Sequence, residues 1–263
     1  MCNAWEGELT TWLGRARALD VLHVWTDYAP PDPQEARRFE VARQSWTALD
    51  WTEAPVRDAE CPRHWHERGK RLPFLVDVVD HAARMANAPS TILVLTNRDS
   101  IVRGDALARI GEKLATFDAC YSRRRNVLGL RHPVPDAYFD KGTEDGGTDL
   151  FAFRASWWDK HRDELDGFLV GVDTWDSVAR LLIDGLSNRA HVPGLVLHDH
   201  RTGDRPWWRV SLSRPGARPY AHRLAWETFE RHGVDPRKEW IRYPLIPTDP
   251  TWFVVPNLTP SRP

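Results

Sequence analysis

Cysteine is scarce in this sequence of 263 residues, which has only Cys2, Cys61 and Cys120. An odd number of cysteines with no Cys-x-x-Cys pair argues against a disulfide framework, and no Cys/His spacing typical of a structural zinc site is present. This usage is typical of a reducing compartment, so we expect a cytoplasmic protein.

Long apolar runs are also missing. No stretch approaches the roughly 18 consecutive apolar residues that a membrane-spanning helix needs, so we expect no membrane insertion. Near the beginning of the sequence stand Glu6 and Glu8, where a secretory signal peptide would have positive charge and then an apolar core. The sequence therefore predicts a soluble protein.

Neither sign of charge is in excess, and lysine is rare. Lys plus Arg number 36 against 37 Asp plus Glu, so the formal net charge of −1 does not mark a protein that coats nucleic acid. The 36 basic residues are 31 Arg and only 5 Lys, and there are 14 Trp. Arg and Trp suit phosphates and the faces of bases and sugars, although genome base composition also accounts for an Arg bias.

Strand and helix patterns alternate along the chain, and no period of 20 to 50 residues indicates a repeat architecture. We expect strands at 19–26, 91–95, 117–122, 149–153 and 194–197, helices at 34–49, 73–86, 104–115, 156–165, 173–186 and 221–232, and loops at 50–71 and 133–147. This alternation predicts one α/β domain, residues 1–243, with a mostly parallel central sheet flanked by helices. The Pro-rich tail 244–263 is expected to wrap the surface.

Polar residues follow the predicted strands, where ligands bind in such sheets. The Walker lysine motif and the Gly-x-Gly-x-x-Gly fingerprint are absent, which argues against a P-loop NTPase and a dinucleotide enzyme. Thr26 and Asp27 follow the first strand, and Asn97 and Asp99 follow the most apolar one. An amide and a carboxylate two residues apart can face a divalent cation or a diphosphate, or can simply close a turn.

Two further groups of residues can carry chemistry. His198 and His200 follow the last predicted strand and offer imidazoles of the kind that transition metals accept, or are merely solvated. Asp173 and Asp176 begin a predicted helix, where Asp173 suits an N-cap with Asp176 in the capping-box position. Asp173 also suits a general base that takes a proton from an acceptor hydroxyl.

Taken in order, these residues resemble the nucleotide-sugar-dependent glycosyltransferases of the GT-A fold. The resemblance runs from about residue 18 to residue 232 and depends on four segments: Thr96–Asp99, Gly147–Phe153, Gly171–Trp175 and His198–His200. Asn97 stands where that superfamily has the first Asp of its Asp-x-Asp motif, and Val172 stands where it has a Glu.

The resemblance implies a single GT-A-like, Rossmann-type domain that moves a sugar from a nucleoside-diphosphate donor to an acceptor hydroxyl. It implies that Asp173 is the catalytic base, and that Asp99 with His198 or His200 holds Mn²⁺ or Mg²⁺ and the donor diphosphate. The residues expected at the donor are Thr26, Asp27, Asp77, Asn97 and Asp99.

A basic and aromatic stretch, residues 201–223, points to the acceptor. It holds six arginines against one acidic residue, Asp204, in a chain that is otherwise net acidic. Arginines that neutralise phosphates and aromatic rings that stack on bases are typical of nucleic-acid surfaces. The acceptor-binding candidates are Arg205, Trp207, Trp208, Arg209 and Arg218.

Several functions remain open from the sequence. The acceptor is a hydroxyl on a modified, hydroxymethylated DNA base, reached in flipped or single-stranded form, or else a small hydroxylated molecule or glycan. A different enzyme class is the second possibility: a metal-dependent hydrolase or nuclease that uses Asp99, Asp173, His198 and His200. A GT-A-like domain that binds without catalysis is the third possibility.

Overall fold

The computed structural model describes residues 20–27, 33–67, 70–127, 130, 133–141, 144–199 and 216–239. Its main sheet has seven strands in the order β2 (Thr52–Arg57), β1 (Val21–Asp27), β5 (Ile92–Thr96), β8 (Glu144–Arg154), β7 (Ala119–Val127), β9 (Val196–Asp199) and β6 (Ser100–Val102). A separate hairpin pairs β3 (His64–Glu67) with β4 (Lys70–Pro73). The helices are α2 (Pro33–Trp46), α3 (Leu75–Ala83), α4 (Ala106–Leu114), α5 (Ala137–Asp140), α6 (Ala155–His161), α7 (Trp175–Asp184) and α8 (Ala217–Arg231).

The direction of the strands changes within the main sheet. Strands β2, β1 and β5 pair in parallel, with the continuous apolar run of β5 buried along its whole length. Strand β8 then enters antiparallel between β5 and β7, while β9 is parallel to β7 and β6 is antiparallel to β9. The predicted fold class, a single α/β domain of GT-A-like, Rossmann type, is confirmed.

The main sheet is curled, as the positions of β5 and β6 show. These two strands are close together in the chain but far apart in the strand order. Thr96 and Ser100 are four residues apart, a span of at most about 14 Å. Four spacings between neighbouring strands would separate β5 and β6 by about 19 Å in a flat sheet. The segment 97–99 therefore crosses from one part of a curved sheet to another, and Ser100 N donates to Asn97 O at 3.0 Å to close this turn.

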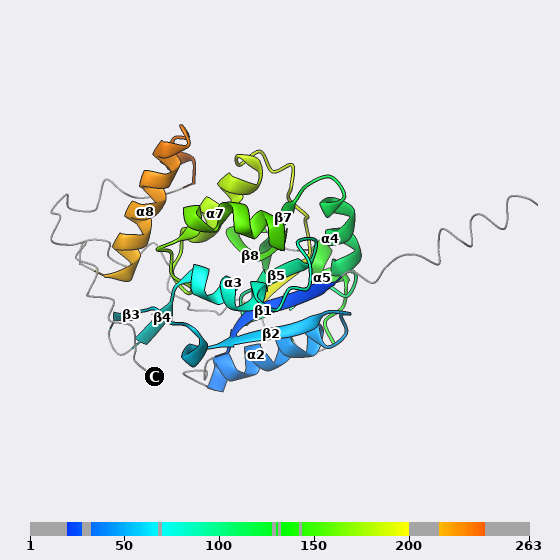
Figure 1. Ribbon diagram of the computed structural model, residues 1–263. Helices are drawn as coiled ribbons and strands as arrows, with labels where there is room; N and C mark the ends of the chain where they lie inside the picture. Colours follow the sequence, from blue (N-terminus) through cyan, green and yellow to red (C-terminus); the bar gives the residue numbers. More distant parts are fainter. Residues whose placement is uncertain are drawn as a thin grey trace, which may run out of the picture.

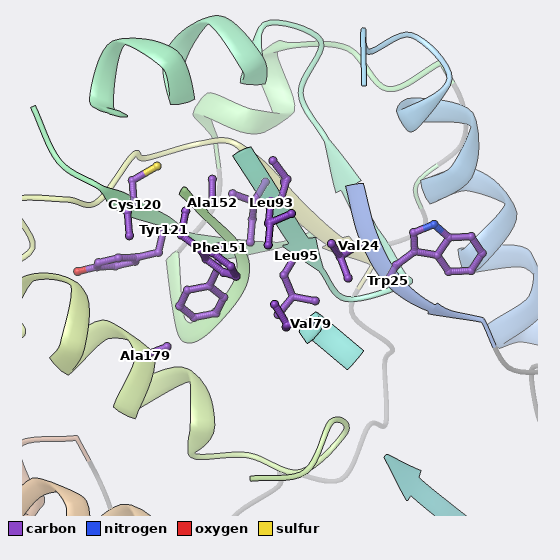
Figure 2. Close-up of a cluster of buried hydrophobic side chains, with 14 of the residues drawn as sticks. Val24, Trp25, Val79, Leu93, Leu95, Cys120, Tyr121, Phe151, Ala152 and Ala179 are labelled. Atoms are coloured by element: carbon purple, nitrogen blue, oxygen red, sulfur yellow. The ribbon is translucent and has the colours of Figure 1, made fainter. Parts of the chain in front are cut away.

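Helices cover the sheet on both sides, with α2 on one side and α3 and α7 on the other (Figure 1). Figure 2 shows Leu95 and Phe151 of the sheet directed toward the side on which Val79 of α3 and Ala179 of α7 lie. On the α2 side, the His23 ring stacks on another aromatic ring, that of Trp51, with ring centroids 3.9 Å apart. Apolar layers on both faces explain why β1 and β5 have nearly continuous apolar sequences.

Part of the sequence-based assignment is wrong. The stretch 50–71, expected to be a loop, contains β2, β3 and the first half of β4, and the expected loop 133–147 contains α5 and the beginning of β8. Strand β2 alternates exposed, half-buried and buried side chains and includes Pro55, so it lacks the apolar run that marks β5. The three-residue strand β6 was also missed, because it is too short for a periodic pattern.

No helix in the described part of the chain is long and apolar enough to span a lipid bilayer. The tail 244–263, expected to wrap the surface, lies outside the described residues.

Candidate active site at the carboxyl edge of the sheet

The polar residues predicted from the sequence gather at one edge of the sheet. The carboxyl ends of the parallel strands β1 and β5 lie there, and so do the carboxyl ends of β7 and β9. Because β8 is antiparallel to both of its neighbours, Thr148 and Asp149, which come just before its pairing with β5, lie at this same edge. The edge therefore combines Asn97 and Asp99 with His198 and Asp149.

Asp149 is a site residue that the sequence analysis did not single out. Asn97 donates from its Nδ2 to Asp149 Oδ1 at 2.9 Å, and Arg124 Nη1 approaches the same oxygen at 3.5 Å. Asp149 Oδ2 is buried and has no hydrogen-bond partner within the described part of the chain. Burial raises the pKa of Asp149, and the positive charge of Arg124 opposes that rise only in part.

Asp99 and His198 are brought into direct contact, as the sequence predicts for two members of one site. His198 Nε2 lies 3.1 Å from Asp99 Oδ2, and the Arg38 guanidinium lies 3.7 Å from the same oxygen. Burial alone would raise the pKa of Asp99, but the hydrogen bond to His198 and the charges of His198 and Arg38 outweigh it and lower the pKa. Burial would lower the pKa of His198, and its partner Asp99 raises it instead.

These residues satisfy only part of what a metal site requires. Within the described ranges, no three His, Cys, Asp or Glu side chains are arranged to hold a metal ion, and His200 lies outside those ranges. Mg²⁺ and Mn²⁺ often take one or two protein ligands and complete their shell with substrate phosphates and water. Asp99 and His198 fit that arrangement, since one is a carboxylate and the other an imidazole in contact with it.

Asp173 lies in the loop just before α7, and its expected role as helix N-cap is wrong. The helix begins at Trp175, and its N-cap is Thr174, which has a positive φ of 94°. Asp176 accepts a hydrogen bond from Thr174 N at 3.2 Å with Oδ1 and one from Thr148 N at 3.4 Å with Oδ2. Burial raises the pKa of Asp176, and the negative charge of Asp173 adds to this rise.

Helix α8 approaches Asp173 from the other side and holds both of its carboxylate oxygens. His222 Nε2 lies 3.2 Å from Oδ2, and Arg218 Nε lies 3.1 Å from Oδ1. Burial would raise the pKa of Asp173, but the hydrogen bond from His222 and the charge of Arg218 lower it. Asp173 is therefore an ionised carboxylate at neutral pH, a state that a general base requires.

The remaining residues expected at the donor, Thr26, Asp27 and Asp77, lie elsewhere, and the two carboxylates pair with arginines. Asp27 at the end of β1 pairs with Arg57 at 3.7 Å, and Thr26 is half-buried beside it. Asp77 on α3 is buried and accepts hydrogen bonds from the backbone N and the guanidinium of Arg63, the latter at 2.8 Å from Oδ1. Neither Asp27 nor Asp77 forms a hydrogen bond or ion pair with Asp99.

Most of the acceptor candidates cannot be placed. Arg205, Trp207, Trp208 and Arg209 lie outside the described residues. Arg218 is described, and its partner is the candidate base Asp173.

The comparisons with known proteins support the fold. No protein-family model matches the sequence, and no curated protein matches it either. Among solved structures, 56 chains match. TarS 1-349 from S. aureus, in complex with UDP-GlcNAc, is similar over 84% of this chain and 69% of its own, with 11% identity and a TM-score of 0.51. The galactosyltransferase LgtC, in complex with donor and acceptor sugar analogs, matches with 13% identity over 80% of this chain and 96% of its own, with a TM-score of 0.31.

The chain thus shares its fold with TarS, in agreement with the fold that the sequence predicts.

Proposed function

We propose that this protein is a glycosyltransferase that moves a sugar from a nucleoside-diphosphate donor to an acceptor hydroxyl. The observation that carries the proposal is a continuous row of acidic groups at the carboxyl edge of the sheet. Asp176 links the two ends of this row, because its Oδ2 accepts from the backbone N of Thr148, beside Asp149, and its Oδ1 accepts from that of Thr174, beside Asp173. The row runs from Asp99 through Asp149 and Asp176 to Asp173, which supports a donor site next to a base. TarS, which shares the fold, is in complex with UDP-GlcNAc, a donor of this class.

The donor diphosphate is assigned to the Asp99 end of this row. Arg38 and Arg124 supply positive charge there, and the Asn97 amide adds a polar group held by Asp149. A divalent cation held by Asp99 and His198, with His200 as a further candidate, would neutralise diphosphate charge when bound. Thr26 and Asp27, at the end of β1, are assigned to the nucleoside.

Asp77 is assigned a supporting role in the donor pocket. It is buried on α3 and anchors the Arg63 guanidinium, which also pairs with Asp166 at 2.8 Å. Its hydrogen bonds to the backbone and side chain of Arg63 hold the segment before β3 against α3. Through Arg63 it would fix the shape of the pocket rather than contact the donor itself.

Asp173 is assigned the proton transfer. Its carboxylate takes the proton of the acceptor hydroxyl while the acceptor oxygen bonds to the anomeric carbon of the sugar. The bond from that carbon to the diphosphate oxygen breaks, and the nucleoside diphosphate leaves with the electron pair. Positive side chains at the diphosphate stabilise the charge that develops on the leaving group.

The test is the Asp173→Asn variant, which keeps the size of the side chain and removes the basic carboxylate. Transfer, or hydrolysis of the donor by water, is measured with UDP-, GDP- and CMP-sugars in the presence of Mn²⁺, beside a thermal-shift panel of the same compounds. We expect a melting temperature within a few degrees of wild type and a fall in kcat of about 100-fold or more. Asp163→Asn, at an exposed carboxylate, is the control that keeps full activity. Full activity in Asp173→Asn would rule out the role of Asp173 as base.

For the acceptor, we propose a hydroxyl on a modified, hydroxymethylated DNA base. The Arg-rich stretch 201–223 supports this choice, because its six arginines match a phosphate backbone and its aromatic rings match exposed bases. Arg205, Trp207, Trp208, Arg209 and Arg218 are its assigned contacts. A small hydroxylated molecule or a glycan is the competing acceptor class.

Salt dependence separates the two acceptor classes. Binding of a labelled single-stranded oligonucleotide, measured by fluorescence anisotropy over a salt series, should weaken with a log–log slope of about −0.7 for each phosphate contacted. Replacing Arg205, Arg209 and Arg218 together by Gln should flatten this slope and leave UDP or GDP binding unchanged. No oligonucleotide binding at low salt would instead favour the small acceptor.

The hydrolase alternative gains no support. A metal-dependent nuclease built on Asp99, Asp173, His198 and His200 would need these side chains around one or two ions. In the described part of the chain Asp173 is held by α8, whereas Asp99 and His198 contact each other.

A further inference from the structure

The two oxygens of the Asp173 carboxylate have different surroundings, although both face α8. Oδ2 forms a hydrogen bond with His222 Nε2 at 3.2 Å. Oδ1 lies 3.1 Å from Arg218 Nε, but it is buried and has no aligned hydrogen bond from any described residue. Oδ1 is therefore the oxygen without an aligned hydrogen bond, and the Arg218 guanidinium faces it at ion-pair distance.

The two residues of α8 also differ in their exposure. Arg218 and His222 are four residues apart, so they lie on one face of the helix. The His222 side chain is only 2% exposed, whereas that of Arg218 is 26% exposed. Since an ionised carboxylate only accepts hydrogen bonds, Nε2 of His222 must carry the hydrogen. The Arg218 side chain reaches solvent, whereas the His222 ring is enclosed.

The segment before α7 fixes this geometry further. Thr174 Oγ1 donates to Ala221 O of α8 at 3.1 Å, one residue before His222. This bond ties the loop that carries the base to the helix that carries its partners. Thr174 holds a positive φ there, a conformation that costs about 1–3 kcal/mol in a residue other than glycine and persists only where surrounding contacts impose it.

We propose that His222 is a positioning residue that keeps Oδ2 of Asp173 in place, that Oδ1 is the oxygen which accepts the proton, and that Arg218 restrains Oδ1 until the acceptor arrives. This inference rests on the proposed function and assigns separate roles to two residues of α8. His222 acts in every state of the site. Arg218 prevents water from being activated in the absence of an acceptor, and it withdraws when the acceptor hydroxyl takes its place beside Oδ1.

Removing the two residues should change catalysis in opposite directions. Since the acceptor is unidentified, donor hydrolysis by water is measured with UDP- and GDP-sugars. His222→Phe, which keeps the ring and removes the donor, should lower kcat by about tenfold or more at an unchanged KM for the donor. His222→Gln, whose amide can donate to the same oxygen, should recover part of that loss. Arg218→Gln should raise hydrolysis several-fold.

Two residues at the end of α8, Arg231 and the C-cap His232, serve as matched controls. His232→Gln and Arg231→Gln change the same residue types near the end of the helix, where both contact Glu164 instead of Asp173. Both variants should hydrolyse the donor at the wild-type rate. Equal rates in wild type, His222→Phe and Arg218→Gln would overturn the proposal.

A second measurement does not require the protein to be enzymatically active. The Asp173 carboxyl is followed by carbon NMR against pH, with its signal assigned by its loss in Asp173→Asn. The charged and titratable groups that face it are Arg218 and His222 of α8 and Asp176 of its own segment. Its titration midpoint should rise by about one pH unit in His222→Phe and also in Arg218→Gln. An unchanged midpoint in both variants would overturn the inference. If wild-type protein neither bound nor hydrolysed any nucleotide sugar, the proposed function would be overturned, but this titration could still be measured.

Discussion

Two buried carboxylates at the edge of the sheet are pushed toward opposite charge states by their neighbours. Asp99 lies against His198 and Arg38, and its pKa is lowered. For Asp149, burial outweighs the attraction of Arg124, and its pKa is raised. Environments that separate the pKa values of neighbouring acids are typical of catalytic sites, where one group stays ionised and the other readily holds a proton.

Replacing Asp99 should remove the effect of metal on donor binding. Asp99→Ala deletes the carboxylate shared by His198 and Arg38, so the proposed divalent cation would lose its anionic protein ligand while His198 and Arg38 remain. Calorimetry with UDP and GDP should show tightening by Mn²⁺ in wild type and none in Asp99→Ala, with circular dichroism unchanged. If Mn²⁺ tightened binding equally in both proteins, Asp99 would not be the ligand.

His23 should make the protein sensitive to moderate acid. Burial lowers the pKa of His23 from 6.5 to about 3, so between these values the unfolded chain takes up a proton that the folded protein excludes. Stability is therefore present above pH 6.5 and is lost as the pH falls. Between pH 7.5 and 5, wild type should lose about 2 kcal/mol more of its unfolding free energy than His23→Gln.

Urea denaturation at the two pH values measures this loss. His66→Gln, at an exposed histidine on the hairpin β3–β4, is the control and should lose as much as wild type. Equal losses in wild type and His23→Gln would show that His23 accepts a proton in the folded protein.

The sequence predicts candidate site residues where they directly follow a strong strand. Asn97, Asp99 and His198 were selected in this way, and the structure brings them to one edge of the sheet. Asp149 was missed although it stands within the segment Gly147–Phe153, because only the antiparallel pairing of β8 with β5 places it beside Asn97, after the end of β5. His222 gave no local signal, since its meeting with Asp173 depends on how α8 packs.

At the scale of the elements, the helices and strands with many buried residues are those that the sequence predicts well. Strand β5 and helices α4 and α7 were predicted within two or three residues of their observed bounds. Most of their buried side chains are apolar, so their periodicity is clear. Strand β2 lies at one edge of the main sheet and the hairpin β3–β4 outside it, with fewer buried positions and a charged sequence, and composition alone predicted a loop there.

A substitution at Gly194, which precedes β9, tests how closely this segment packs against α5. It has a φ of +67°, and a Cβ added there would lie 2.8 Å from the carbonyl oxygen of Phe139 in α5. Gly194→Ala should lower the unfolding free energy by about 2–4 kcal/mol through backbone strain and overpacking. Gly185→Ala, at a φ of +62° with open space around it, should cost only the strain, about 1 kcal/mol. Equal costs in urea denaturation would mean that α5 moves aside freely.

At the scale of the whole molecule, the curl of the sheet creates the site. A fold class can be predicted from alternating strands and helices, but the strand order that brings the beginning of β8 beside the end of β5 cannot. That order places groups from β5, β8, β9 and the loop before α7 along one edge. The parallel strands β2, β1 and β5 form one part of the sheet, and the strands from β7 to β6 form the other.

Strand β8 joins these two parts, and this has a consequence for the order of events during synthesis on the ribosome. The edge of β5 is complete at Thr96, yet its partner ends only at Arg154, so the growing chain carries an open, apolar strand edge while more than 50 further residues are translated. Open edges of this kind pair with other chains. Between the synthesis of Thr96 and that of Arg154, we expect a nascent chain of this protein to depend on chaperones or on rapid elongation. Once β8 pairs with β5, this strand edge is no longer open to other chains.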